Sequence, residues 1–153
     1  MSKIVYVLYK LSNWLYNIKI PLIPYLITIF IRIVFSGWIP YSAQIGKNCK
    51  FGKGAMGVVI HQKTVIGNNC IISHNVTFGG SSKKEKGLLP IVGNKVRIGS
   101  GAAILGNVKI GDNVIIGSNS VVRKDVSDNT IVAGNPAKIL KENIIIEDYV
   151  DFR

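Results

Sequence analysis

The stretch that decides the fold is IGSGAAILGNVKIGDNVIIGSNSVV, residues 98–122. Large apolar residues recur in it at every sixth position, namely Ile98, Ile104, Ile110, Ile116 and Val122, and glycine often follows them directly. A fixed short period of this kind is typical of repeat architectures, in which each unit buries its apolar side against the next. The stretch therefore predicts short stacked strands.

The same period extends back towards the N-terminus. A small or β-branched residue comes four positions after each large one, so the interior of each turn of chain has room for only one bulky side chain. Three six-residue units close a triangular coil of eighteen residues, and about five coils stack with strands roughly 4.8 Å apart. The earlier large residues are Ile45, Phe51, Ile60, Ile66, Ile72 and Phe78.

Two insertions interrupt the period. Three extra residues separate Phe51 from Ile60, and the span from Phe78 to Ile98 is two residues longer than one eighteen-residue coil. The second insertion contains a polar stretch, residues 81–87. Insertions into stacked coils lie at the corners, where loops often carry function. We expect its lysine-rich part, Lys83 to Lys86, to close over a site or to attract an anionic acceptor.

Composition narrows the classes of function. The 153 residues suffice for one domain with a small appendage. A formal net charge of +11 predicts an anionic partner: a phosphorylated cofactor, an acidic polymer or a membrane surface. Every acidic residue lies at or after Glu85, so the first half cannot supply a pair of catalytic carboxylates.

The two cysteines exclude a disulfide-stapled scaffold and favour a cytoplasmic location. Cys49 and Cys70 are 21 positions apart, which is one coil plus the three-residue insertion. We therefore expect two small inward-facing thiols stacked in adjacent coils, with no role as nucleophiles.

Two helices are expected before the repeat, over residues 4–17 and 22–36, with Pro21 and Pro24 breaking the chain between them. The uninterrupted apolar run is shorter than the roughly 20 residues that a bilayer core needs, and no signal-peptide cleavage site is present. The expected organisation is a helical segment over residues 1–38, a repeat domain over 39–140 and a tail over 141–153.

The helical segment has two interpretations. All its charged side chains are basic, and such helices are typical of peripheral contact with anionic lipid, on the inner face of the membrane. The alternative is packing against the end of the repeat domain or against another subunit. The basic residues are Lys3, Lys10, Lys19 and Arg32.

The repeat resembles a known family. The six-residue period, the Gly-Gly-containing loop after Phe78 and the sequence AGNPAK at residues 133–138 resemble the hexapeptide-repeat acyltransferases. Residues 57–66, 76–80 and 99–106 are similar to the serine acetyltransferases and to the related capsule and exopolysaccharide acetyltransferases. The resemblance implies an all-β domain folded as a left-handed parallel β-helix. It also implies a homotrimer with active sites between subunits and acetyl-CoA as the acyl donor.

The sequence departs from the serine enzymes at their acceptor site. Lys53 and Gly54 stand where that family carries an Asp-His pair, and Leu89 stands where it carries a second active-site histidine. The N-terminal helices are more similar to those of the exopolysaccharide members. We therefore expect the acceptor to be a sugar or glycan-precursor hydroxyl in surface polysaccharide biosynthesis, with L-serine or an amino-sugar amine as alternatives.

Acetyl transfer to an alcohol needs a base near neutral pH, and histidine is the suitable residue type. His74, followed by Asn75, resembles the catalytic histidine of sugar acetyltransferases and is expected one coil beyond Lys53. We expect His74 to be the base, oriented by Asn75, a backbone carbonyl or a residue of another subunit.

His61 is the second candidate for the base. It follows Ile60, and we expect its column along the coils to be continued by three glycines, which would leave a groove for the pantetheine arm of the cofactor. In a trimer, His61 would line the cleft that holds His74 of the next subunit. The three glycines are Gly79, Gly99 and Gly117.

The resemblance also implies a set of cofactor contacts. Backbone groups are expected to bind acetyl-CoA at four positions, and basic side chains near the end of the coils are expected to bind its phosphates. The backbone positions are Gly79, Gly80, Ser100 and Ser118, and the basic side chains are those of Arg123, Lys124 and Lys138.

Two other classes of function are disfavoured. The zinc carbonic anhydrases that share this fold need three histidine ligands, whereas this chain has two histidines, so no metal is expected. A nucleic-acid-binding or structural solenoid would use the positive charge, but the repeat lacks stacking aromatic residues among its basic ones.

Overall fold

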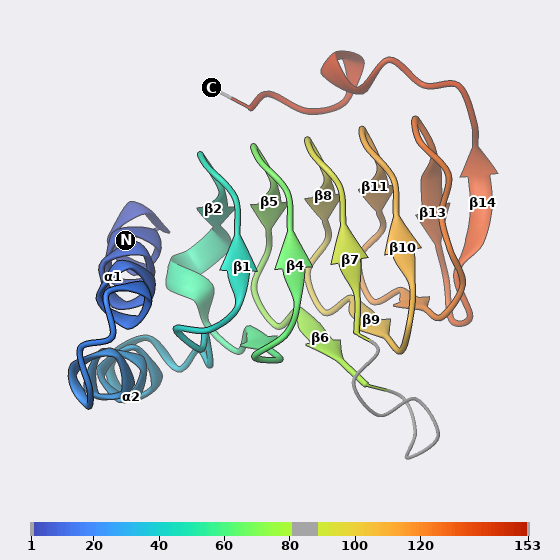
Figure 1. Cartoon of the computed structure of the whole chain (residues 1–153). Coiled ribbons are helices and arrows are strands. Elements are labelled where there is room, and N and C mark those ends of the chain that lie inside the picture. The colour runs from blue at the N-terminus through green and yellow to red at the C-terminus, as the bar shows by residue number, and fades with distance from the viewer. Residues whose placement is uncertain (1, 81–88, 153) are drawn as a thin grey trace.

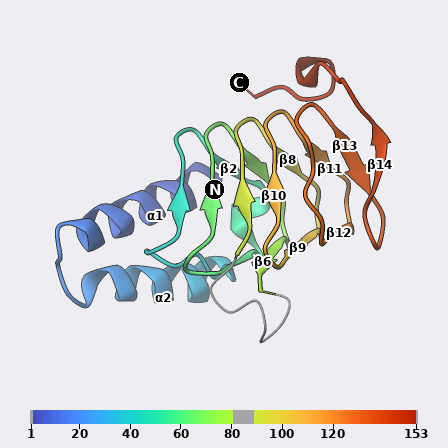
Figure 2. The same ribbon diagram turned by 45° about the vertical axis from the view of Figure 1, so that its right-hand side comes forward.

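The computed structural model describes residues 2–80 and 89–152. Two helices come first, α1 (Ser2–Asn17) and α2 (Ile23–Phe35), close to their predicted bounds. Short strands then form three sheets, which are the faces of a β-helix (Figures 1 and 2). The helices lie at the N-terminal end of the stack of coils, as both views show.

Each face is a ladder of strands from successive coils, parallel except at one end. The first face contains β1 (Gln44–Ile45), β4 (Val65–Ile66), β7 (Ile91–Val92) and β10 (Lys109–Ile110). The second contains β2 (Lys50–Phe51), β5 (Ile71–Ile72), β8 (Arg97–Ile98), β11 (Ile115–Ile116), β13 (Ile131–Ala133) and the antiparallel β14 (Lys138–Lys141). The third contains β3 (Val59–Ile60), β6 (Thr77–Gly79), β9 (Ala103–Leu105) and β12 (Val121–Val122).

The interior of the coils holds the residues that the six-residue period marks. All eleven large apolar residues of the repeat are buried, and so are the small or β-branched residues four positions after them wherever the structure describes those positions. Val92, on β7, is a further large inward residue that the sequence analysis did not assign. The core is therefore a single column of apolar side chains along the axis of the coils.

The predicted register is wrong between Phe78 and Ile98. Phe78 pairs with Ile104, and Ile98 pairs with Ile72, so Phe78 and Ile98 belong to different faces. The chain after Phe78 makes a long insertion and returns to the repeat at Val92 on the first face. The span from Phe78 to Ile98 contains both this insertion and the six-residue unit that ends at Val92, yet it is only two residues longer than one coil. Counting residues therefore suggested one complete coil, which explains the error. The predicted lysine-rich loop, Lys83 to Lys86, lies outside the described residues.

The cysteines stack as predicted. Cys49 and Cys70 are both buried and both reduced, and the Lys50 amide donates a hydrogen bond to the Cys70 carbonyl at 2.9 Å, which fixes them in adjacent coils. The hydrogen bond with Cys49, followed by burial, raises the pKa of the Cys70 thiol. A raised pKa keeps the thiol protonated, so Cys70 is a structural residue.

The corners depend on residues without a side chain or with a short polar one. Where the first face turns toward the second, Gly46, Gly67, Gly93 and Gly111 stack so closely that a Cβ on any of them would collide with the next coil. At the following positions amide and carboxylate oxygens accept backbone N–H groups from the preceding coil, as when Asn68 Oδ1 accepts from the Lys47 amide at 2.8 Å. Polar contacts thus continue the stacking outside the apolar core.

Helix α1 caps the first coil. The buried Tyr9 hydroxyl donates to the Ala43 carbonyl at 2.6 Å and accepts from the Ile45 amide at 3.0 Å. Lys10 Nζ donates to the Ile45 carbonyl at 2.7 Å. Ser12 Oγ donates to the Pro24 carbonyl, which joins α1 to α2. The end of the β-helix is therefore covered by polar as well as apolar contacts.

The C-terminal segment returns along the coils. Figure 1 shows this segment, which contains the short helix η3 (Ile146–Asp148). Glu147 of this helix pairs with Lys95 at 2.9 Å. Near its end the Phe152 carbonyl accepts from Lys50 Nζ at 2.9 Å. The segment thus spans from the last coil back to the first. Across residues 2–80 and 89–152, no helix has the length and apolarity needed to cross a membrane.

Replacing a stacked glycine tests the corner packing. Gly67→Ala should lower the free energy of unfolding by about 1–3 kcal/mol, because its Cβ would meet the Gly93 carbonyl. Gly79→Ala is the control, since there a Cβ meets nothing closer than Leu105 at 4.0 Å. Urea denaturation followed by circular dichroism measures both. Equal stability of the two variants would contradict the stacking.

Tyr9 predicts a pH dependence of stability. Burial raises its pKa from 10.0 to about 12, so the folded protein holds the phenolic proton more tightly than the unfolded chain does. This contribution is complete below pH 10 and is lost as the pH rises through about 12. Tyr9→Phe should cost about 1–3 kcal/mol at neutral pH and should flatten this alkaline decline. The exposed Tyr25→Phe is the control, and an unchanged decline in Tyr9→Phe would refute the assignment.

Candidate functional site

The candidate residues lie on two corners that border the third face. We call the first the His74 corner, because His74, Ser100 and Ser118 occupy equivalent places just after β5, β8 and β11. We call the second the Gly79 corner, and it consists of His61, Gly79, Leu105 and Arg123 at the ends of β3, β6, β9 and β12. Strand β6 runs from the first corner to the second.

Backbone hydrogen bonds hold the His74 corner in register. The Gly101 amide donates to the His74 carbonyl at 3.1 Å, and the Asn119 amide donates to the Ser100 carbonyl at 2.8 Å. The pairing of Phe51 with Ile72 places His74 one coil beyond η1 (Gly52–Ala55), as the sequence predicts. His74 itself is half-buried. His74 therefore stands on a column of hydrogen-bonded coils, with its backbone close to Gly52 of the preceding coil.

Asn75 has a structural role in the turn. Its φ of 56° is left-handed, as are those of Gly101 and Asn119 at equivalent places. Glycine and asparagine adopt this conformation most readily. The Asn75 amide donates to the Met56 carbonyl at 2.8 Å, and its side chain lies against Gly57. These contacts shape the loop that presents His74.

The predicted glycine groove above His61 is wrong. Gly99 and Gly117 follow β8 and β11, so they belong with the residues next to His74 rather than with His61. The column of His61 continues through Gly79 and then Leu105, whose side chain approaches Gly79. The error follows directly from the missed insertion after Phe78. Leu105 is a residue of the site region that the shifted register concealed.

His61 is exposed, and the described residues bring it into no cluster with His74. Its Nδ1 accepts from the Lys63 amide at 3.3 Å, which holds the ring beside its own turn. The two histidines stand on opposite corners of the third face. A single chain therefore offers two separate bases.

The surface between the two corners carries small side chains. Thr77, Ala103 and Val121 project outward from β6, β9 and β12, and all three are half-buried. The third face thus forms a shallow floor bordered by His74 on one side and Gly79 on the other. Three coil spacings, about 14 Å, separate the coil of His74 from the last coil.

The predicted phosphate-binding side chains come together at the last coil. Arg123, Lys124 and Lys138 line one cavity of about 530 Å³. Its floor is formed by inward residues of the last coil, including Val122 and Val132, and its far wall by residues 136–139. Asp125 also lines it, a residue that the sequence analysis did not assign. Gly79 and Gly80 lie elsewhere, beside Leu105 and Leu89.

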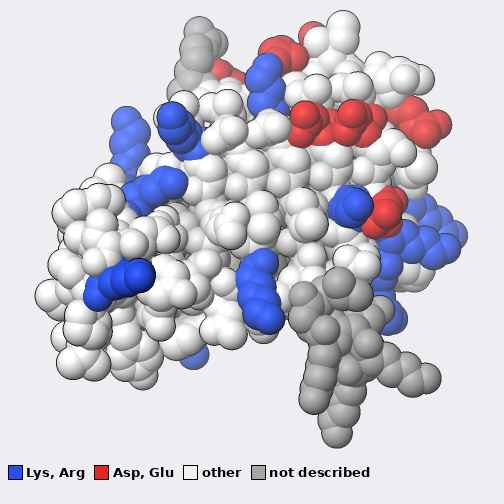
Figure 3. Space-filling model, viewed as in Figure 1, with Lys and Arg blue, Asp and Glu red and all other residues white. Residues whose placement is uncertain are grey.

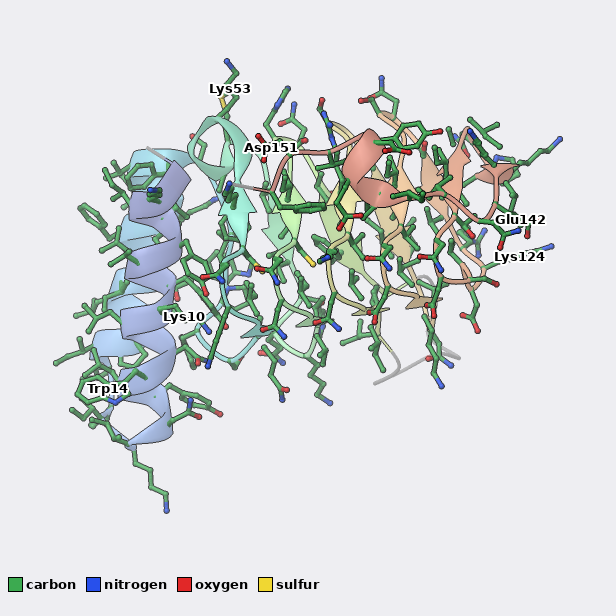
Figure 4. The ribbon with its side chains drawn as sticks, turned by 90° about the horizontal axis from the view of Figure 1, so that it is seen from above. Lys10, Trp14, Lys53, Lys124, Glu142 and Asp151 are labelled. Carbon is green, nitrogen blue, oxygen red and sulfur yellow. The ribbon has the colours of Figure 1, made fainter. Side chains whose placement is uncertain are left out.

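The positions that depart from the serine enzymes are well defined. Lys53 is exposed in the turn of η1 and has a left-handed φ of 49°, and Gly54 is buried beside it (Figure 4). Leu89 is 9% exposed and is in contact range of Gly80. Within residues 2–80 and 89–152, no three His, Cys, Asp or Glu residues cluster closely enough to hold a metal ion.

Comparison with known proteins identifies the repeat. Residues 90–124 match the family described as bacterial transferase hexapeptide (six repeats). The serine acetyltransferase of Synechococcus elongatus is 35% identical over 145 residues, which are 95% of this chain and 59% of that protein. Residues 90–124 thus carry the repeat of this transferase family, and nearly the whole chain is similar to a serine acetyltransferase. The left-handed parallel β-helix expected from the sequence is thereby confirmed.

Solved structures agree with this hexapeptide-repeat assignment. A serine acetyltransferase from Brucella abortus in complex with coenzyme A superposes with a TM-score of 0.83 at 34% identity, covering 88% of this chain and 54% of the other. A soybean serine acetyltransferase complexed with serine gives 0.82 at 36% identity, covering 89% and 56%. The chain therefore spans less than two thirds of the length of these relatives.

These matches correct one prediction. The relatives and the solved structures are serine acetyltransferases, so the expected sugar or glycan acceptor in polysaccharide biosynthesis is wrong. That expectation gave most weight to Lys53, Gly54 and Leu89. Similarity along nearly the whole chain is stronger evidence about the acceptor than the departures at these three positions.

Proposed function

We propose that the protein is an acetyl-CoA-dependent O-acetyltransferase whose acceptor is the hydroxyl of L-serine. Similarity to serine acetyltransferases over 95% of the chain carries this proposal. The geometry is compatible with it, because a half-buried imidazole and a cationic cavity lie on the same rigid column of coils. The donor is a cytosolic metabolite, which favours a cytoplasmic location for the enzyme.

His74 is the proposed general base. It takes the proton of the serine hydroxyl as the oxygen attacks the thioester carbonyl, and a C–O bond forms while the carbonyl becomes an oxyanion. Collapse of this intermediate breaks the C–S bond and releases the CoA thiolate, which takes the proton from the imidazolium. Backbone N–H groups beside the floor of the third face are suited to binding the oxyanion.

The cavity at the last coil is the proposed site of the cofactor's phosphates. Arg123, Lys124 and Lys138 supply three cations there, and among the described residues that line the cavity Asp125 is the only acidic one. From this cavity the pantetheine arm would run along the floor of the third face, towards the coil of His74. Ser100 and Ser118 border that path with backbone groups, and Gly79 and Gly80 border it from the opposite corner.

A trimer is part of the proposal. The outward side chains of β9 and β12 on the third face are small, such as Ala103, and they are only half-buried, which leaves room for a neighbouring subunit. Packing of three copies side by side would bring the His61 of one subunit to the cleft that holds the His74 of another. This arrangement would explain why a single chain keeps the two histidines apart.

The role of His74 is tested by substitution. His74→Ala should lower the rate of CoA release from acetyl-CoA and L-serine by about 10²–10⁴-fold, because it removes the base. His61→Ala is the matched control and should have the smaller effect. A thiol-release assay measures both. Unchanged turnover in His74→Ala would reject the base, and no CoA release with L-serine would reject the acceptor.

The phosphate site is tested with a shortened donor. Combining Arg123→Gln, Lys124→Gln and Lys138→Gln should raise the KM for acetyl-CoA by at least about tenfold, since each charged hydrogen bond contributes about 1.5–3 kcal/mol before solvent screening. The KM for S-acetylpantetheine, which lacks the nucleotide, should stay the same. An equal change for both donors would place the phosphates elsewhere.

A further inference from the structure

The two N-terminal helices leave a large apolar surface uncovered. We define the apolar helix face as eleven side chains that are each 45 to 75% exposed. On α1 they recur at spacings of three and four, so they form one stripe along the helix. The face consists of Ile4, Val7, Leu11, Trp14 and Ile18 on or beside α1, and of Leu22, Ile23, Leu26, Phe30, Ile33 and Val34 on or beside α2.

This face points away from the rest of the molecule. The opposite sides of the helices are used, since Val5, Tyr9 and Ile31 are fully buried in the core. Figure 4 shows Trp14 on the side of α1 that is turned away from the coils. Monomeric proteins rarely expose a contiguous apolar patch of this extent. The apolar helix face therefore requires an occupant.

The charges of the helical segment identify the occupant. Lys3, Lys19 and Arg32 are all exposed, and the helical segment has no acidic residue. Figure 3 shows acidic side chains over the later coils and the C-terminal segment and none over the helices. A second copy of this chain docking face to face would bring cations from each side together without a carboxylate. An anionic surface is complementary to the same charges.

A hollow at the edge of the face adds a second indication. It has a volume of about 460 Å³ and lies at the turn between α1 and α2. Tyr16, Tyr25 and Tyr41 line it together with Lys19. Phenol and ammonium groups beside exposed apolar side chains are the combination found at the headgroup level of a bilayer.

We propose that α1 and α2 bind the surface of an anionic phospholipid bilayer, with the apolar helix face inserted at the level of the headgroups and Lys3 and Lys19 against lipid phosphates. The helices would lie in the plane of the membrane, because neither is long enough to cross it. Lys10 does not take part, since its ammonium is held by the Ile45 carbonyl and lies over the Tyr6 ring. This proposal does not depend on the acetyl-transfer reaction.

Vesicle binding tests the proposal. The full chain should cosediment with vesicles of equimolar phosphatidylcholine and phosphatidylglycerol, more weakly with phosphatidylcholine alone, and less as the salt concentration rises. Combining Trp14→Ser, Leu26→Ser and Phe30→Ser should weaken binding by about tenfold for each side chain. Combining Lys3→Glu and Lys19→Glu should remove the preference for the anionic vesicles.

A matched control variant distinguishes binding through the apolar helix face from nonspecific binding through any exposed apolar side chain. Ile91→Ser, Leu140→Ser and Ile145→Ser change side chains that are equally exposed but lie on the coils and the C-terminal segment. This variant should bind vesicles as the unchanged protein does, and thermal unfolding should show all variants to be folded.

Three results would overturn the proposal. The first is no vesicle binding by the unchanged protein, and the second is equal loss of binding in the control variant. The third is self-association, seen by sedimentation velocity, that the three serine substitutions on the helices abolish while vesicle binding is absent. That last result would assign the apolar helix face to a second copy of the chain.

Discussion

The structure depends on the stacking of one coil on the next. Each strand is only two to four residues long, so it is stable only because it hydrogen-bonds to strands of neighbouring coils. The stacking distance leaves no room for a Cβ at Gly46, Gly67, Gly93 or Gly111. The same constraint places one large and one small residue inside each corner-to-corner unit. Every other feature of the molecule is attached to this column.

Rigid stacking explains how the candidate site is built. His74 and Ser100 are far apart in sequence but occupy equivalent places in adjacent coils, and their carbonyls accept hydrogen bonds from the coil that follows. The cationic cavity lies at the end of the same column. A repeat of this kind can therefore present a base, a flat floor and a phosphate site at fixed separations without a conventional enclosed pocket.

The two ends of the column of coils are covered in different ways. At the C-terminal end β14 turns back antiparallel, and the chain after it returns along the coils as far as Lys50. At the N-terminal end α1 and α2 cover the first coil, but their outer side remains apolar and basic. The helices thus cover the end of the first coil but expose an apolar face of their own. This exposed face is the physical basis for the proposed membrane contact.

The sequence by itself determined the six-residue period, the inward residues up to Phe78 and from Ile98 to Val126, the stacking of Cys49 on Cys70 and the place of His74 beyond Lys53, because all of these follow from counting residues between insertions. Only the tertiary structure decided the register after Phe78. A long insertion hides one unit of the repeat from residue counting. In the structure Gly99 and Gly117 therefore lie at a different corner from the predicted one, and Leu105 follows Gly79 in the column of His61. Sequence period specifies which residues face inward, whereas the hydrogen-bonded pairing of strands specifies which residues share a corner.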